Sequence, residues 1–484
     1  MVTYADLMPL APELFLLGAT CAILLVDLFV SAQRRGLVHF LALLALVATG
    51  ILTFRMSSGD AVSTSAFGGM FLRDTMGNVL KLAVYVVTGA AFVYAKPYLT
   101  ERGLFRGEFY VLCLFSVLGM MLLISAGSLV MIYLGLELLA LSSYALVALD
   151  RDSPLASEAA MKYFVLGALA SGMLLYGLSM LYGATGSLDI AAIYRAAAAP
   201  GDHSLLLLGL VFVIVGIAFK FGAAPFHMWL PDVYHGAPTA ITLFIGSAPK
   251  LAAFAMAYRL LEGAAGPLDG YWRDMIMLLS VLSLATGNLI ALMQTNLKRM
   301  LAYSTISHVG FLFMGLSAGN AQGYAAAMFY AISYSLMSAA AFASIIALSR
   351  RGFEADRIDD FKGLNARNPW LAALVLCVMA SLAGIPFFLG FWAKLAVLRA
   401  AVDGGALWLA LAGLVFAVIG AYYYLRVIKV MYFDEPVEAE EGQGHAGSAD
   451  PHLRWLLTVN ASLLLVLGFS WNSLMQWCQQ SFAG

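Results

Sequence analysis

Long apolar runs separated by short polar segments dominate the chain. A helix needs about 20 mostly apolar residues to cross a bilayer. About fourteen runs of that kind fall near residues 11–30, 37–55, 75–95, 108–126, 128–149, 158–182, 204–229, 237–261, 272–292, 300–318, 323–348, 369–401, 405–432 and 453–478. The pattern predicts an all-α polytopic membrane protein with about fourteen transmembrane helices.

The composition places these runs in lipid rather than in a soluble core. Of 484 residues, 62% are hydrophobic and 11% are charged, whereas a soluble domain carries about 25% charged residues. The formal net charge of −1 gives no reason to expect nucleic-acid binding. The run at 11–30 has no basic segment before it and no small-residue cleavage site after it, so we expect a retained helix.

The basic residues of the connecting loops indicate an orientation. Lys and Arg concentrate in the cytoplasmic loops of membrane proteins. If the N-terminus lies outside, sixteen basic residues fall in cytoplasmic loops, Lys298 among them. The outer loops then hold six: Arg55, Arg73, Arg195, Arg259, Arg273 and Arg399. The asymmetry predicts that both termini lie outside.

Proline interrupts two of the runs in similar sequence. Residues 220–231 and 384–394 each contain a Pro-Phe pair, a nearby glycine, a tryptophan and a lysine. Such a break persists in lipid only where protein buries it or where it lines a wet cavity. The broken runs are the seventh and the twelfth. We therefore expect two five-helix repeats, runs four to eight and nine to thirteen, around a midplane transport site.

The chain is expected to form one membrane domain, 1–484, with an internal division. Its parts are N-terminal helices (1–107), a first half-channel repeat (108–261), a second half-channel repeat (272–432), a soluble loop (433–452) and a C-terminal helix (453–484). The loop at 434–452 carries six carboxylates and several glycines, so we expect it to be solvated and without chemistry. The many charged residues at 350–368 predict a second soluble segment.

Five basic residues lie inside the apolar runs, and all five are lysines: Lys81, Lys162, Lys220, Lys250 and Lys394. Lysine can lose its proton when it is desolvated, whereas arginine in effect cannot. Ionisable residues inside membrane segments are costly and mark proton or ion pathways. The pattern favours a relay of single titratable groups, although it leaves the roles of Lys81 and Lys162 open.

Glu137 and Lys220 are the first candidates. Glu137 stands near the middle of the fifth run, where a charge costs roughly 2.5–3.5 kcal/mol. A Glu137–Lys220 pair would form a switchable proton site, because gaining or losing the acid changes how tightly the amine holds its proton. The alternatives are a neutral, hydrogen-bonded glutamic acid and a static ion pair.

Lys250, Lys394 and two histidines extend the candidate relay. Lys250 could instead pair with an unseen acid, and Lys394 could extend its amine toward water from the helix break. His227 follows Lys220 by seven residues, and His308 stands among hydroxyl residues. A lone histidine is more often a satisfied core group, but beside buried lysines these two are candidates for proton transfer.

The sequence shows no clear motif for metal binding, nucleotide binding or hydrolysis. Cys21, Cys113, Cys377 and Cys478 lie far apart with no Cys-x-x-Cys, so neither zinc nor an iron–sulfur cluster is expected in this chain. No Gly-x-Gly-x-x-Gly follows a strand-like run. No Ser-His-Asp arrangement or Gly-x-Ser-x-Gly is evident. We therefore expect no cofactor-binding, metal-binding or redox-active residues here.

Four stretches carry a resemblance to a known family. They are Leu-Glu-Leu around Glu137, the stretch Lys-Phe-Gly-Ala-Ala-Pro-Phe-His-Met-Trp-Leu-Pro and onward at 220–239, Ala-Pro-Lys at 248–250, and Leu-Lys-Arg-Met-Leu-Ala-Tyr-Ser-Thr-Ile-Ser-His at 297–308. Over about 70–432 the chain resembles the antiporter-like membrane subunits of proton-pumping NADH:quinone oxidoreductase, respiratory complex I. The motif at 220–239 also occurs in subunits of multisubunit sodium/proton antiporters and membrane-bound hydrogenases.

Three features resemble the N-type subunit of that complex. They are the Leu-Ala-Pro-Glu sequence at 10–13, a lysine at Lys394 where the M-type sister has a glutamate, and an end after run fourteen. The resemblance implies proton translocation, with Glu137 and Lys220 as an interacting pair, Lys250 as the central lysine and Lys394 on the exit side. His227 and His308 match histidines of the family's hydrophilic axis.

The resemblance also implies partners and a location. NADH oxidation and quinone reduction would occur on other subunits, which would hold NADH, FMN, iron–sulfur clusters and quinone. The partners would be other membrane subunits, including the M-type sister and the small membrane subunits, together with lipid. The chain would lie in the bacterial inner membrane with periplasmic termini. The rival readings are a subunit of a multisubunit sodium/proton antiporter and a purely structural membrane subunit.

Overall fold

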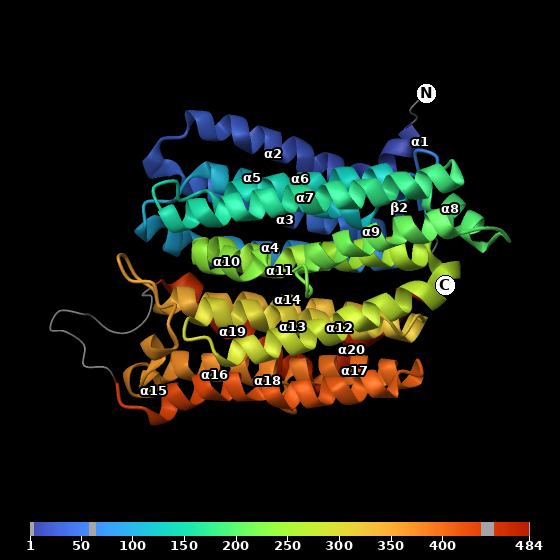
Figure 1. Cartoon of the computed structure of the whole chain (residues 1–484). Helices are drawn as coiled ribbons and strands as arrows, with labels where there is room; N and C mark the ends of the chain where they lie inside the picture. The colour runs from blue at the N-terminus through green and yellow to red at the C-terminus, as the bar shows by residue number, and fades with distance from the viewer. Residues whose placement is uncertain (1–3, 58–63, 437–449, 484) are drawn as a thin grey trace.

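The computed structural model describes residues 4–57, 64–436 and 450–483. Long helices run side by side between two ends of one bundle (Figure 1). The all-α membrane fold is therefore confirmed, with one small hairpin as an addition. Most of the soluble loop expected at 433–452 lies outside the described residues.

The N-terminal part contains long helices and the hairpin. Its elements are α1 (Tyr4–Leu7), η1 (Met8–Leu10), α2 (Ala11–Phe29), η2 (Ala32–Arg34), α3 (Gly36–Ser57), β1 (Thr64–Ala66), β2 (Phe71–Arg73) and α4 (Thr75–Glu101). The two strands pair antiparallel, with Ser65 opposite Leu72. Strands of three residues are too short to show a period of two in the sequence.

The middle part includes the first broken helix. Its elements are α5 (Gly107–Ile124), α6 (Leu129–Val147), α7 (Pro154–Thr185), α8 (Ile190–Ala198), α9 (Ser204–Phe221), α10 (Trp229–Gly236), α11 (Thr239–Tyr258), η3 (Arg259–Ala264) and η4 (Gly266–Leu268). Aspartate and serine N-caps begin several of these helices, as Ser128 does for α6 and Asp189 for α8.

The C-terminal part includes the second broken helix. Its elements are α12 (Asp269–Leu292), α13 (Leu297–Leu316), α14 (Ala321–Leu348), η5 (Ile358–Phe361), α15 (Leu364–Arg367), α16 (Pro369–Ala383), α17 (Leu389–Asp403), α18 (Leu407–Phe433), α19 (Pro451–Phe469) and α20 (Trp471–Gln480). The predicted last run, 453–478, is thus two helices, because the chain leaves helical geometry at Ser470.

Twelve helical segments of the described residues are long and apolar enough to cross a membrane. α13 has 20 residues but a polar sequence, and α16 and α17 have 15 residues each. Counting α13 and the α16–α17 pair as crossings would give the fourteen expected from the sequence. Length and hydropathy do not settle that number, which stays a prediction.

The two runs in which the sequence predicts a break, the seventh and the twelfth, are both broken in the structure. α9 ends at Gly222 (φ 77°) and α16 ends at Gly384 (φ 85°), each in the left-handed conformation that favours glycine. Residues 222–228 separate α9 from α10, and residues 384–388 separate α16 from α17. Each break leaves the last carbonyls of the first half-helix without intrahelical partners.

One local arrangement occurs twice, at opposite ends of the bundle. Ser128 and Asp189 form an isolated antiparallel bridge, and so do Asn296 and Arg357. Ser128 N-caps α6 and Asn296 N-caps α13, while the bridge partners precede the short helices α8 and η5. α8 lies at the right-hand end in Figure 1, and α15, which follows η5, lies at the left-hand end. The same local arrangement thus occurs once in each part of the chain, at opposite ends of the bundle.

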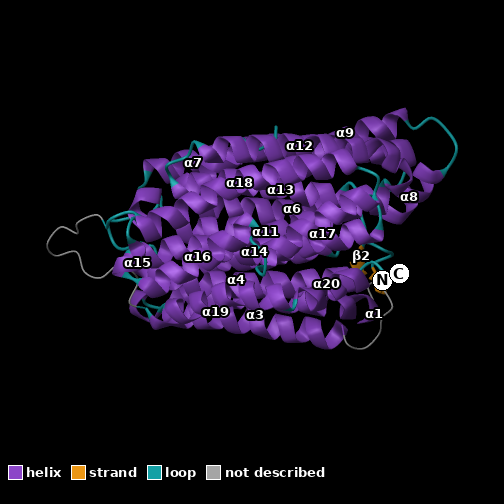
Figure 2. Ribbon diagram, turned by 90° about the horizontal axis from the view of Figure 1, so that it is seen from below, coloured by secondary structure: helices purple, strands orange, loops and turns teal. Residues whose placement is uncertain are grey.

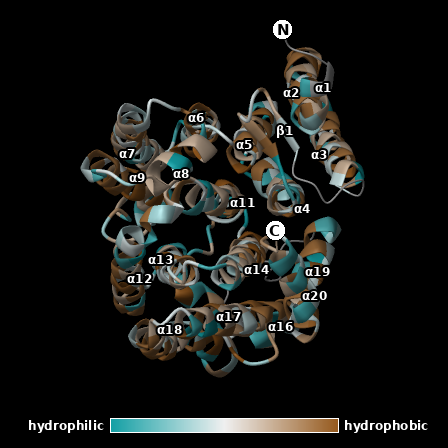
Figure 3. Ribbon diagram, turned by 90° about the vertical axis from the view of Figure 1, so that its right-hand side faces the viewer, coloured by the Kyte–Doolittle hydropathy of each residue, from teal (hydrophilic) through white to brown (hydrophobic). Residues whose placement is uncertain are grey.

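α11 and α14 form the centre of the bundle. The most apolar stretch of α11 and η3 is 100% buried, and that of α14 is 94% buried. Viewed along the helices, α11 and α14 lie between the other helices of the two halves (Figure 3). Both chain ends lie at the same end of the bundle (Figure 2). Groups on α11 and α14 are therefore shielded from lipid by the surrounding helices.

Candidate functional site

Glu137 and Lys220 face a common region but form no direct ion pair in the described part of the chain. Glu137 lies on α6, and Lys220 lies in the last turn of α9. α7 packs against both helices. One carboxylate oxygen of Glu137 is buried without a hydrogen-bond partner. The Glu137–Lys220 pair therefore stays a prediction.

A small cavity lies beside Lys220. Its volume is about 10 Å³, and its lining comes from α6, α7 and α9, including Tyr144, Gly167, Ser171 and Lys220. A single water needs roughly that much room and two or more polar partners. The tyrosine and serine hydroxyls with the lysine amine provide such partners. The cavity can therefore hold a water between the two helices that carry the acid and the amine.

Lys250 caps the end of the first broken helix. It is buried in the middle of α11, and its Nζ donates a hydrogen bond of 2.5 Å to the carbonyl of Phe221. Trp229, whose ring centroid lies 5.8 Å from that Nζ, covers the amine. No carboxylate of the described residues lies within ion-pair distance. The partial negative charge of a helix C-terminus stabilises a cation at this position.

Lys394 occupies the same kind of position in the second broken helix. Its Nζ donates to the carbonyls of Leu382 and Ala383 at 2.9 and 2.8 Å, at the C-terminal end of α16. The residue is 7% exposed, so its amine points inward and does not extend to water. In each half of the chain, the free carbonyls at a helix break thus bind a buried lysine. The lysine comes from the neighbouring helix α11 in the first half and from α17, the second part of the same broken helix, in the second half.

His308 lies in a buried hydroxyl network. Its Nδ1 is 2.6 Å from the Tyr330 hydroxyl and its Nε2 is 3.0 Å from the Tyr424 hydroxyl. Tyr424 also contacts the Ser304 hydroxyl. The imidazole ring of His308 stands 4.9 Å from the ring of Tyr334. The network spans α13, α14 and α18, and hydroxyls bonded on both sides of an imidazole can exchange protons with it.

His227 lies in the break between α9 and α10. It is half-buried, and its Nδ1 is buried without a hydrogen-bond partner. Trp229, two residues later, donates from its Nε1 to the Phe219 carbonyl at 2.9 Å. The structure thus places His227 beside the first broken helix and His308 in the second half of the chain.

The remaining membrane lysines have ordinary partners. Lys81 forms a 2.5 Å ion pair with Glu13, and both side chains are 3% exposed. Lys162 is 44% exposed and pairs with Glu158 and Asp232. An exposed pair of this kind contributes little to stability. These contacts provide static neutralisation and do not join either lysine to the others.

Sequence reasoning missed Lys298 and Glu354. The orientation argument placed Lys298 in a cytoplasmic loop, but it is the second residue of α13 and is 3% exposed. Its Nζ donates to the Ala237 carbonyl at 2.7 Å. Glu354 stands in the charged segment 350–368 and pairs with Arg102 at 2.6 Å. The available signal was the position of Lys298 directly before an apolar run. At such a position the sequence does not distinguish the end of a loop from the first turn of a helix.

Comparisons with known proteins identify the family of the chain. Residues 126–420 match the family model described as NADH:quinone oxidoreductase/Mrp antiporter, TM. A protein of Xanthomonas euvesicatoria pv. vesicatoria, named NADH-quinone oxidoreductase subunit N, is 60% identical over 483 residues, covering 100% of this chain and 98% of its own length.

Solved structures share the fold. A chain of respiratory complex I from Thermus thermophilus superposes with a TM-score of 0.81 at 32% identity, covering 96% of this chain and 98% of its own. A chain of the membrane-bound sulfane sulfur reductase, an archaeal respiratory membrane complex, superposes with a TM-score of 0.85 at 25% identity, covering 99% and 97%. The chain belongs to the NADH:quinone oxidoreductase/Mrp antiporter membrane family and, within it, to the NADH-quinone oxidoreductase subunit N proteins.

Proposed function

We propose that this chain is a proton-translocating membrane subunit of bacterial NADH-quinone oxidoreductase. Whole-length identity to proteins named subunit N supports the assignment to that complex. The groups that carry protons would be Glu137, Lys220, Lys250 and Lys394, with His227 and His308 as additional relay members. The observation that carries the proposal is that two buried lysines, one in each half, bind broken-helix carbonyls instead of acids.

The first half of the relay would be Glu137, Lys220 and Lys250. The amine of Lys250 binds the carbonyl of Phe221, the residue next to Lys220, so the two amines share one end of α9. If both amines are protonated, their positive charges repel each other in a medium of low dielectric constant. A proton gained by Lys220 would therefore favour release of a proton from Lys250.

The second half of the relay would be His308 and Lys394. Hydroxyls of α14 connect the halves: Ser335 donates to the Ser247 carbonyl of α11 at 3.1 Å, and Tyr334 bonds to Thr305 of α13 at 2.7 Å. Thr305 is one turn before His308 on the same face of α13. Hydroxyls and intervening waters can carry a proton from Lys250 toward His308 and then toward Lys394.

Tight coupling to a redox reaction is needed, since moving one charge against 100 mV costs about 2.3 kcal/mol. NADH oxidation and quinone reduction would take place on other subunits, which would hold NADH, FMN, iron–sulfur clusters and quinone. A change in charge or conformation at a neighbouring subunit would alter the distance between Glu137 and Lys220. That change would start each transfer.

The remaining parts of the proposal concern placement. Residues 108–261 and 272–432 would be the two half-channel repeats, and the recurrence of the bridge at Ser128 and Asn296 supports this division. The chain would lie in the bacterial inner membrane with both ends on the periplasmic side. Its neighbours would include the M-type antiporter-like sister and the small membrane subunits.

Two experiments test the proposal. Purification in mild detergent, followed by identification of the co-migrating chains, should recover the other subunits of the quinone reductase. Recovery of sodium/proton antiporter subunits instead would favour the rival assignment. The variant Lys220→Ala should assemble but lose proton pumping in proteoliposomes during NADH oxidation. Normal pumping by an assembled Lys220→Ala complex would falsify the relay.

A further inference from the structure

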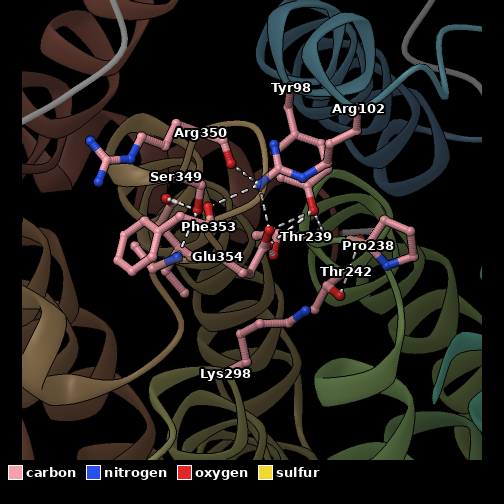
Figure 4. A network of polar contacts seen from close by, with 12 residues as sticks. Tyr98, Arg102, Pro238, Thr239, Thr242, Lys298, Ser349, Arg350, Phe353 and Glu354 are labelled. Carbon is pink, nitrogen blue, oxygen red and sulfur yellow. Dashed lines mark hydrogen bonds and ion pairs between the residues drawn. The ribbon is translucent and has the colours of Figure 1, made fainter. Parts of the chain in front are cut away.

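Glu354 joins three segments at one end of the bundle (Figure 4). Its carboxylate accepts hydrogen bonds from the Tyr98 hydroxyl of α4 at 3.0 and 3.1 Å and from Arg102, the C-cap residue of α4, at 2.6 Å. The Thr239 hydroxyl, in the first turn of α11, donates a further short bond to it. The Arg102 guanidinium also stacks 3.7 Å from the Tyr98 ring centroid. The Glu354 carboxylate therefore contacts the first turn of the central helix α11.

Lys298 lies on the inner side of this cluster. In Figure 4 its side chain extends toward Thr242, and its Nζ binds the Ala237 carbonyl at the end of α10. Glu354, Asp356 and Arg102 are the charged groups that act on it. Asp356 in turn lies 3.9 Å from the His235 imidazole. The cluster thus combines a partly exposed acid with a fully buried amine.

The acid can reach water. The Glu354 side chain is 27% exposed, whereas Lys298 is 3% exposed. Burial opposes ionisation of Glu354, but Lys298, Arg102 and the bonds from Thr239 and Tyr98 together hold its pKa below the ordinary value. The carboxylate is therefore ionised at neutral pH and holds a proton only transiently, which suits a group that takes up a proton and passes it on.

A polar stripe leads inward from Thr239 along one face of α11. Thr242, Gly246 and Lys250 follow Thr239 at spacings of three and four residues, which place all of them on the same face. The Tyr234 hydroxyl lies beside Gly246, 3.2 Å from where a Cβ would stand. The eleven residues from Thr239 to Lys250 span roughly 16 Å of helix.

Hydroxyls of α14 border the same stripe. Ser338 donates to the Gly246 carbonyl and Ser335 to the Ser247 carbonyl, each at 3.1 Å. The Thr242 hydroxyl donates to the Tyr234 carbonyl at 3.1 Å. Hydroxyl groups both donate and accept hydrogen bonds, so the hydroxyls along this stripe can bind water molecules between them. The stripe is therefore a polar seam between the two central helices, α11 and α14, with Glu354 at one end and Lys250 at the other.

We propose that Glu354 and Lys298 form a proton-uptake port that supplies Lys250 along this face of α11. The carboxylate accepts a proton from a hydronium ion in the surrounding water. The resulting carboxylic acid then passes the proton to the neutral Lys298 amine or, through bound water, inward past the Thr239 and Thr242 hydroxyls. The proton then passes through waters to Lys250 in its neutral form. The inference rests on the proposed function, since it assumes that Lys250 carries protons.

The test uses the whole complex in proteoliposomes with its cytoplasmic side outward. The variant Glu354→Gln keeps the size of the side chain but cannot ionise. A positioned proton-transfer group contributes roughly a hundredfold or more to a proton step, and bypass by water leaves an expected loss of about tenfold in the initial pumping rate at alkaline pH. The rate should recover in mildly acidic medium or with a small permeant weak acid such as formate.

Two further variants and one control sharpen the result. Glu354→Asp keeps the acid and should pump nearly normally. Thr242→Val leaves the Glu354 contacts intact but removes a hydroxyl from the stripe, and should show the same loss at alkaline pH. Asp359→Asn is the matched control, because Asp359 is an exposed carboxylate of the same segment that pairs locally with Lys362 at 2.9 Å. It should leave pumping unchanged.

The outcomes separate the two proposals. If Lys220→Ala abolishes pumping while Glu354→Gln keeps the unaltered pH profile, the uptake port is wrong and the proposed function stands. If Glu354→Gln lowers pumping equally at every pH without rescue by formate, Glu354 is a structural clamp, and the port is again wrong. If Lys220→Ala pumps normally, the proposed function itself fails.

Discussion

Lys250 and Phe221 connect the centre of the bundle to the first broken helix: the Lys250 amine donates to the Phe221 carbonyl. That carbonyl has no intrahelical partner, because α9 stops at Gly222. The contact positions Lys250 beside the residue that follows Lys220. A carbonyl at the helix break thus binds Lys250, and Lys220 is the neighbouring residue on α9.

The variant Lys250→Arg should separate charge from proton exchange at this contact. Arginine keeps the cation that the end of α9 attracts, but it does not release its proton. We expect an assembled complex whose pumping rate falls by roughly a hundredfold, the contribution of a positioned proton-transfer group. Native gels should show normal assembly, and a pH-sensitive dye in proteoliposomes should report the loss. Pumping at the unaltered rate would remove Lys250 from the relay.

The ion pair between Glu13 and Lys81 should support stability and not pumping. Both side chains are 3% exposed, and removing one partner of a buried pair costs about 3–5 kcal/mol. Lys81→Met should therefore lower the unfolding temperature of the purified complex. The double variant Glu13→Gln/Lys81→Met should recover most of that loss. A single variant with an unchanged unfolding temperature would show that the pair contributes nothing.

Gly119 should be intolerant of a side chain. A Cβ at Gly119 would lie 2.6 Å from the Leu139 amide nitrogen and 2.8 Å from the Gly135 carbonyl oxygen, both backbone atoms of α6. Gly119→Ala should therefore push α5 and α6 apart, at about 1–3 kcal/mol. Gly172→Ala is the control, since nothing lies within 4 Å of its Cβ position. Thermal unfolding of both variants measures the difference, and equal stability would contradict the close packing.

The contacts of Glu354 predict a pH dependence of stability. The pKa of Glu354 is lower in the folded chain than its ordinary value. Its contribution should be fully present above the ordinary pKa of the carboxyl and should vanish as the pH falls through the lowered one. The difference in unfolding temperature between the unaltered complex and Glu354→Gln should therefore be largest at neutral pH and shrink on acidification. A difference that grows with acidification would show the opposite shift.

The sequence by itself determined the membrane class, the helical runs and the two breaks. Apolar length and periodicity are local properties, and the combination of proline with nearby glycine at 220–231 and 384–394 favours a helix break through local backbone geometry. The costly residues Glu137, Lys220, Lys250 and Lys394 could also be found locally, because a charge inside an apolar run is visible without a fold.

Only the tertiary structure decided what those residues contact. It separates Glu137 from direct contact with Lys220 and gives Lys250 and Lys394 carbonyl partners on other helices. It also moves Lys298 from a presumed loop into the buried start of α13. These partners lie 11 to 61 residues away along the chain. Packing between helices sets them, and no local pattern encodes packing at that separation.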